Sequence, residues 1–146
     1  MKANRPLGFP SPVTKYHFIV ALLATTMGLY SFTFFQAKPW NVPEADAKKV
    51  NPVKSDAESL KTGKELWSKH CTSCHGKTGL GDGTKAAQLE TEMEDFTTDK
   101  VQKQSDGALF YKIQAGRDEM PTFKKKIPDE SEIWSVINYV RTLKAK

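Results

Sequence analysis

The chain has 146 residues and a formal net charge of +5 at pH 7, with 22 basic and 17 acidic residues. The charges of both signs are interspersed, without an arginine-rich run or an alternation of basic and aromatic residues, so the composition gives no support to a nucleic-acid-binding protein. The length accommodates one modest domain and one additional segment.

The first predicted element is a transmembrane helix over residues 16–36. Residues 16–35 contain no Asp, Glu, Lys or Arg, and as a helix they span about 30 Å, the thickness of a bilayer's hydrocarbon core. Basic residues flank the segment on both sides, so charge alone does not orient it. Those that precede it favour a cytoplasmic N-terminal stub, residues 1–15.

A cleaved signal peptide is the alternative interpretation of this segment. The apolar region of a signal peptide usually has about 7–15 residues and ends at a small-x-small cleavage site. The apolar run here is longer, and the sequence directly after it offers only poor sites. We therefore expect an uncleaved signal anchor that crosses the cell inner (cytoplasmic) membrane once, with the rest of the chain facing the periplasm.

Residues 37–56 are predicted to form a flexible linker. They contain Pro39, Pro43 and Pro52, mixed charges and few apolar residues, which argues against a packed element. About twenty residues span about 25 Å as a flexible coil and about 60 Å in an extended polyproline form. A domain on such a tether could swing between partners in a membrane.

The last segment, residues 57–146, is predicted to be an all-α domain. Apolar residues at helical spacing indicate helices over residues 57–70, 105–116 and 129–146, and residues 95–104 are a candidate for a further short helix. Ser55 or Asp56 can cap the first helix, and Ser55 with Glu58 fits a capping box. A domain this short buries a thin core, so a large internal cofactor would add stability.

The two cysteines of the chain, Cys71 and Cys74, are separated by two residues and followed directly by His75. Cys-x-x-Cys-His is the attachment motif for c-type haem. Each thiol can form a thioether with one haem vinyl group, and the histidine can then reach the iron as an axial ligand. The motif predicts one covalent haem c, with its iron, bound by these three residues.

Other roles for the cysteines are less well supported. A zinc site needs about four ligands, and the remaining candidates are His70, which is adjacent, and His17, at the membrane. A dithiol redox motif would require a βαβ setting, and a structural disulfide would leave His75 unexplained. Residues 76–78 resemble the end of a phosphate-binding loop, but Cys71 occupies the position of its required glycine.

Iron bound by His75 needs a second axial ligand or has an open site. Met120 is the favoured candidate, because Pro121 stiffens the backbone and biases Met120 toward an extended conformation. Met93 lies among acidic residues only eighteen positions after His75 and is expected at the surface or beside the haem. We predict that His75 and Met120 are the metal ligands, an arrangement that raises the reduction potential.

From about Ala57 to its end, the chain resembles a class I, monohaem cytochrome c of the membrane-anchored bacterial type. The matching order is a helix with Gly63 and Trp67, the haem motif, a glycine-rich loop, the Met120 segment and a last helix that carries Tyr139. The resemblance implies a cytochrome c fold of four or five helices around one covalent haem, with Gly63 and Tyr139 where the first and last helices cross. It also implies an electron carrier rather than an enzyme.

The expected function is electron transfer between membrane respiratory or photosynthetic complexes on the extracytoplasmic side, without nucleic acid or a small-molecule substrate. The partners would be redox protein complexes that act as electron donor and acceptor. Lys124, Lys125 and Lys126 could form a basic docking patch for an acidic partner, although an ordinary solvated charge run has the same sequence. The alternatives are a fixed haem-c subunit of a larger quinol-oxidising or terminal oxidase complex, and a haem enzyme or sensor with an open iron site.

Overall fold

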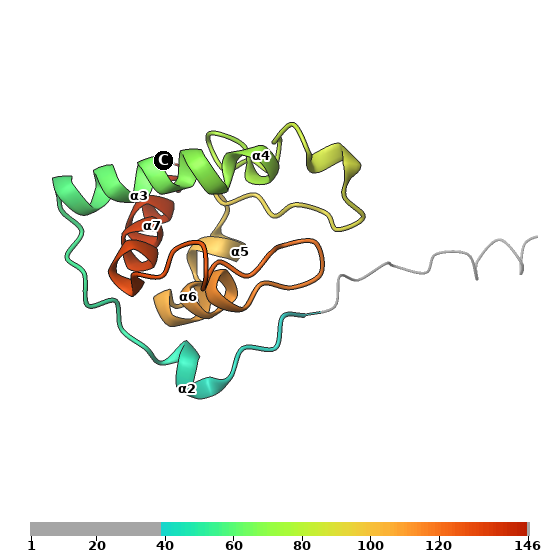
Figure 1. Ribbon diagram of the computed structural model, residues 1–146. Helices are drawn as coiled ribbons and strands as arrows, with labels where there is room; N and C mark the ends of the chain where they lie inside the picture. The colour runs from blue at the N-terminus through green and yellow to red at the C-terminus, as the bar shows by residue number, and fades with distance from the viewer. Residues whose placement is uncertain (1–38, 146) are drawn as a thin grey trace, which may run out of the picture. The chain divides into compact units, whose positions relative to one another are not determined.

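The computed structural model describes residues 39–145 (Figure 1). The predicted transmembrane segment, residues 16–36, lies outside the described residues. Along residues 39–145 there are six α-helices and one short 3-10 turn: α2 (Glu44–Ala47), α3 (Ala57–His70), α4 (Thr72–His75), η1 (Ala86–Gln88), α5 (Asp99–Gln102), α6 (Asp106–Ala115) and α7 (Glu130–Thr142).

The predicted helical class is confirmed for the described part of the chain. The expectation was four or five helices; the structure has six there, of which α2, α4 and α5 are single turns of four residues. No helix within residues 39–145 is long and apolar enough to cross a membrane.

Helices α3 and α7 cross at a close contact, which Figure 1 shows as the green helix lying over the red one. Gly63 of α3 is buried at this crossing. A Cβ atom on Gly63 would collide with the carbonyl oxygen of Ser135 and would lie 2.9 Å from the Cβ of Tyr139, both on α7. The predicted pairing of Gly63 with Tyr139 is therefore confirmed, and the two helices approach this closely because Gly63 has no side chain.

Helix α3 begins with a capping box that differs from the predicted one. Asp56 is the N-cap; its carboxylate accepts a hydrogen bond from the Ser59 backbone at 3.0 Å, and the Ser59 hydroxyl accepts one from the Asp56 backbone at 3.1 Å. The prediction of a box between Ser55 and Glu58 was wrong. The helix starts after Asp56 rather than after Ser55, so the third residue after the cap is Ser59.

The core lies between α3, α6 and α7. Trp67 of α3, Phe110 of α6, and Trp134 and Ile137 of α7 are all buried in it. The rings of Phe110 and Trp134 are stacked at a centroid distance of 4.1 Å and an interplanar angle of 14°. This stack joins α6 to α7, and the Lys49 ammonium lies 5.7 Å from the Phe110 ring centroid.

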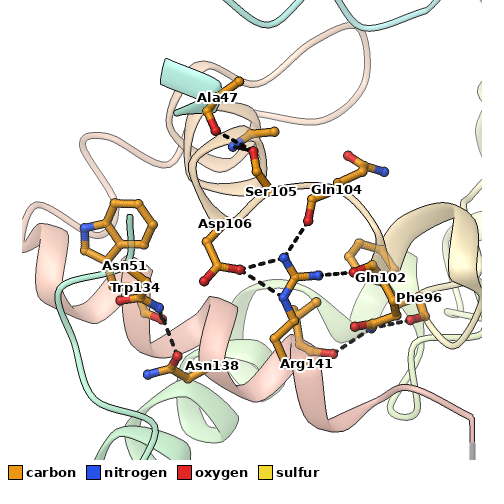
Figure 2. Close-up of polar contacts among 12 residues, drawn as sticks. Ala47, Asn51, Phe96, Gln102, Gln104, Ser105, Asp106, Trp134, Asn138 and Arg141 are labelled. Atoms are coloured by element: carbon orange, nitrogen blue, oxygen red, sulfur yellow. Dashed lines mark hydrogen bonds and ion pairs between the residues drawn. The ribbon is translucent and has the colours of Figure 1, made fainter. Parts of the chain in front are cut away.

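Arg141 of α7 holds the segment that leads into α6 (Figure 2). Its guanidinium donates two hydrogen bonds to the Asp106 carboxylate, at 2.9 and 2.6 Å, and further ones to the carbonyl oxygens of Gln102 and Gln104, at 2.9 and 2.6 Å. A planar guanidinium can serve all of these acceptors at once. The connection between α5 and α6 is thereby fixed to α7.

Residues 40–53, hereafter the strap, pack against α6 and α7 (Figures 1 and 2). The Ser105 hydroxyl donates to the Ala47 carbonyl oxygen at 2.6 Å, and the Asn51 side chain donates to that of Asn138 at 2.9 Å. This differs from the flexible linker expected over residues 37–56. The prolines of the strap lack backbone N–H donors. The strap is held instead by the packing of α2 against α6 and by these two side-chain hydrogen bonds.

Candidate functional site

The Cys-x-x-Cys-His motif lies in one tight turn that continues directly from α3. Cys71 ends α3, and its backbone N–H donates to the Trp67 carbonyl oxygen at 2.9 Å. The carbonyl oxygen of Cys71 then accepts from the backbone of Cys74 at 3.2 Å and of His75 at 2.9 Å. The structure therefore brings the two thiols and the imidazole together on a single helical turn, as predicted from the motif.

Both cysteines are free thiols and are half-buried. Burial, and to a lesser degree the neighbouring Cys74, raises the pKa of the Cys71 thiol to about 12. A thiol with such a pKa has very little thiolate at neutral pH, whereas the reactive cysteine of a dithiol redox motif has a lowered pKa.

The imidazole of His75 lies between two aromatic rings. Phe96 contacts it edge to face at a centroid distance of 4.9 Å, and Trp67 lies at 5.9 Å. Burial lowers the pKa of His75, against a smaller opposing effect of the Glu94 charge. The ring is therefore neutral at pH 7, which is the protonation state that binds a metal.

One ring nitrogen of His75, Nδ1, is buried and has no hydrogen-bond partner among residues 39–145. An unpaired buried polar atom costs free energy, so a histidine placed for packing alone would be expected to have a partner. Together with the two adjacent thiols, this neutral imidazole is the donor set of a covalent haem c. The residues present thus fit the cofactor that the motif predicts.

The glycine-rich loop after His75 folds back over the haem-attachment turn. The backbone N–H of Gly81 donates to the His75 carbonyl oxygen at 3.0 Å, and that of Gly83 donates to the Cys74 carbonyl oxygen at 3.2 Å. A Cβ on Gly83 would lie only 2.6 Å from the Cys74 carbonyl oxygen, and Gly81 has a φ of 78°. The loop satisfies the last carbonyl groups of α4 and needs glycine for this close approach.

Met120 lies on a two-residue hairpin that follows α6. The backbones of Arg117 and Met120 pair with each other through two hydrogen bonds, both 2.9 Å long. Asp118, at the tip, has a φ of 51°, and Gly116, at the end of α6, has a φ of 65°. Met120 is half-buried and packs against the same core cluster as Cys71.

Met93 and the three lysines are placed as follows. Met93 is half-buried beside Gly81, where a Cβ on the glycine would lie 3.0 Å from the Met93 Cβ.

Lys124, Lys125 and Lys126 are exposed on the loop after the hairpin. The Lys126 ammonium lies 5.3 Å above the Phe123 ring, which contacts His70 at a centroid distance of 5.9 Å. Lys126 therefore lies near the end of α3, close to Cys71.

Two neighbours of this site were not predicted as such. Phe96 was placed only in a possible short helix, and Trp40 only in a linker. Phe96 reaches His75 because its backbone N–H donates to the Gly79 carbonyl oxygen at 2.7 Å. Residues 77–98 have no regular hydrophobic pattern from which this contact could have been predicted. Trp40 contacts the Arg117 guanidinium. In the sequence, a single tryptophan between Pro39 and Pro43 is only a weak indication that this segment packs against the domain.

Comparison with known proteins identifies the family to which the chain belongs. The family model described as cytochrome c oxidase, cbb3-type, subunit III matches residues 58–140, more than half of the chain. Among solved structures, the chain is similar to one of the Kuenenia stuttgartiensis reducing HAO-like protein complex Kustc0457/Kustc0458, with a TM-score of 0.60 and 24% identity. The match covers 86% of this chain and 60% of that chain, and at this identity it shows a shared fold alone. No curated protein matches.

Proposed function

Because the chain belongs to the cytochrome c oxidase, cbb3-type, subunit III family, a family of monohaem c-type cytochromes, we propose that it transfers electrons through one haem with His75 and Met120 as axial ligands. Covalent haem c is the cofactor of this family, and when bound it supplies a one-electron iron couple. The residues of the chain attach the haem, hold its axial ligands and shield it from water.

The observation that carries the proposal is the environment of His75. Its imidazole is neutral, lies against Phe96 and Trp67, and has one buried nitrogen without a partner among the described residues. The adjacent Cys71 and Cys74 are free thiols available for thioether bonds. If His75 and Met120 both held the iron, the haem would supply a one-electron couple with little reorganisation and would need no substrate site.

Met120 is proposed as the second axial ligand on two grounds. It is half-buried and packs against the cluster that Cys71 also contacts. Its hairpin is rigid, with a double backbone pairing to Arg117 and Pro121 directly after it. A thioether ligand would raise the reduction potential above that of an open or bis-histidine site.

We further propose that the protein works at the extracytoplasmic face of the inner membrane, anchored by residues 16–36. The family match favours a fixed subunit of an oxidase-type complex over a diffusing shuttle. The attachment of the strap to α6 and α7 also argues against a long flexible tether, a feature that had favoured a shuttle only weakly. Lys124, Lys125 and Lys126 would then contact an acidic surface of a redox partner beside the haem-attachment turn.

The test is the intact mass of the protein from washed membranes of a host that can attach haem c. We expect the mass of the full chain plus one haem. Replacement of both cysteines by alanine should abolish covalent haem, whereas Ser73→Ala, an exposed change within the same turn, should leave it intact. A product without covalent haem would contradict the proposed function.

The fixed-subunit arrangement is tested separately by purification in mild detergent. Stoichiometric membrane subunits should accompany the haem-bearing protein and remain bound at moderate salt. A protein that purifies alone, yet reduces or oxidises added membrane complexes catalytically, would support the shuttle instead.

A further inference from the structure

We propose that the strap, through Trp40, positions the hairpin that carries Met120 and so sets how readily an external ligand replaces Met120 at the iron. The inference rests on the proposed function, because it takes Met120 to be an axial ligand. In it Trp40 is a positioning residue that acts through Arg117, not a ligand.

The strap is fixed at the end distant from the hairpin. Asn51 donates from its side-chain nitrogen to the Asn138 side chain at 2.9 Å (Figure 2) and to the Trp134 carbonyl oxygen at 3.3 Å. Asn138 in turn donates to the Val53 carbonyl oxygen at 3.1 Å. Asn138 itself is buried on α7. The exchange of hydrogen bonds in both directions fixes the register of the strap on α7.

The middle of the strap is fixed at the start of α6. The Ser105 hydroxyl donates to the Ala47 carbonyl oxygen at 2.6 Å. A Cβ on Gly107 would collide with the carbonyl oxygen of Asp46 and would lie 2.8 Å from that of Lys49. The backbone of the strap therefore touches α6 where the helix has no side chain, which leaves the strap little freedom to shift.

From there the strap runs along α6 toward the other end of that helix, where Trp40 lies. The Trp40 ring lies 4.6 Å from the Arg117 guanidinium carbon and 5.3 Å from the Lys112 ammonium, both measured to the ring centroid. Trp40 is half-buried by these contacts. Two cations on one indole ring give a cation–π contact at the base of the hairpin.

Arg117 transmits this contact to Met120. The two residues form the paired positions of the hairpin, with both backbone hydrogen bonds 2.9 Å long. The Arg117 guanidinium also forms an ion pair of 3.1 Å with Asp118, the residue with positive φ at the hairpin tip. A displacement of Arg117 therefore displaces Met120.

Other contacts hold the hairpin from different sides. The Thr91 backbone donates to the Glu119 carboxylate at 2.8 Å, and the Phe123 backbone donates to the Ile113 carbonyl oxygen at 3.1 Å. These bonds maintain the loop when the strap is loosened. Loss of the Trp40 contact should thus shift the balance between bound and displaced Met120 without unfolding the protein.

The experiment uses the full-length holoprotein and titrates its ferric form with imidazole. We expect Trp40→Ala to tighten imidazole binding by about three- to thirtyfold, because the lost ring contact favoured the Met120-bound state by a factor in that range. Trp40→Phe, which keeps an aromatic face, should restore most of the wild-type affinity. The matched control is Val50→Ala on the same strap, because the Val50 side chain is 84% exposed.

Two further measurements separate positioning from simple stability. Hydrogen exchange of the Met120 and Arg117 amides should accelerate in Trp40→Ala, whereas the amides of α3 and α7 should not change. If Trp40→Ala yields too little protein, Asn51→Ala loosens the strap from its far end and should produce the same direction of change in imidazole affinity.

The outcomes distinguish this inference from the proposed ligation. The wild-type ferric protein should show the long-wavelength methionine-to-iron charge-transfer absorption. If it does, and Trp40→Ala binds imidazole with wild-type affinity, the inference is wrong while the ligation stands. If the wild type lacks that absorption and binds imidazole as tightly as Met120→Ala, the ligation is wrong, and the inference fails with it.

Discussion

The indole nitrogen of Trp67 donates a hydrogen bond to the carbonyl oxygen of Gly76 at 3.2 Å, and so joins α3 to the residue directly after His75. The same indole ring faces His75 and contacts Phe96 edge to face at a centroid distance of 5.4 Å. Gly76 has a φ of 79°, where the chain leaves α4. One buried residue of the first long helix thus fixes both the imidazole ring and the path of the chain beyond it.

Trp67→Phe should lower the stability of the holoprotein without preventing haem attachment. The smaller ring keeps an aromatic face but leaves the Gly76 carbonyl oxygen without its donor, which costs about 1–3 kcal/mol of unfolding free energy. Denaturant unfolding measures the loss. Trp134→Phe is the control: it also makes a buried ring smaller, and it measures the loss of unfolding free energy that the smaller ring causes by itself. A loss in Trp67→Phe no greater than in that control would mean that the hydrogen bond contributes nothing.

Met120→Ala should leave the covalent haem in place but lower its reduction potential, because a thioether ligand favours ferrous iron. The opened site should also let the ferrous protein bind carbon monoxide readily. Potentiometric titration and carbon monoxide difference spectra provide the measurements. Met93→Ala is the matched control on a nearby loop. A potential and a spectrum unchanged from wild type would refute the axial role of Met120.

Gly63→Ala should destabilise the protein although alanine favours a helix over glycine. The added Cβ collides with the Ser135 carbonyl oxygen and crowds Tyr139, so α3 and α7 must separate. Overpacking of this kind costs about 1–3 kcal/mol, more than the helix-propensity gain of about 1 kcal/mol. Thermal unfolding should show a lower midpoint than wild type. As a control, Lys64→Ala changes an exposed residue at the next position of α3 and should have little effect on the unfolding midpoint. A midpoint for Gly63→Ala equal to that of the wild type would rule out the close crossing of α3 and α7.

The N-cap of α3 should make stability depend on pH in the acid range. The hydrogen bond from the Ser59 backbone is the main cause that lowers the pKa of Asp56 below its ordinary value of 3.8. A carboxylate with a lowered folded-state pKa contributes stability that is fully present above the unfolded-state pKa. That contribution is lost as the pH falls from about 3.8 through the lower folded-state pKa.

Asp56→Asn tests this dependence, because asparagine keeps an acceptor for the cap but carries no charge. Unfolding free energies measured from pH 6 down to about pH 2 should decline less steeply in Asp56→Asn than in the wild type. Glu65→Gln, an exposed change on the same helix, serves as the reference for general charge effects. Parallel curves for the wild type and Asp56→Asn would contradict the assigned role of the cap.

The features that could be predicted from the sequence are those set by local spacing. Cys71, Cys74 and His75 fall within one helical turn, so their proximity follows from helix geometry alone. A helix was predicted over residues 105–116, and in the structure Ser105 and Gly116 are the N-cap and C-cap of α6. The contact of Gly63 with α7 followed from a family resemblance rather than from spacing.

The features that could not be predicted depend on contacts between distant segments. The strap has no hydrophobic periodicity, and its attachment relies on Asn51 meeting Asn138, 87 residues later. Phe96 approaches His75 through an irregular loop whose path is determined by backbone bonds rather than by side-chain pattern. A proline-containing polar segment has the composition of a linker whether or not a helix elsewhere offers hydrogen-bond partners.

The strap also affects which fragments of this domain would be stable. The family match begins at residue 58, yet residues 40–53 provide partners for Asn138, Ser105 and the Phe110 face. A protein trimmed to the matched region would leave the buried Asn138 without its Asn51 and Val53 contacts and would uncover Gly107, against which the backbone of the strap packs. A stable fragment should therefore include the strap, so truncation to the recognisable family segment is expected to produce a weakened protein.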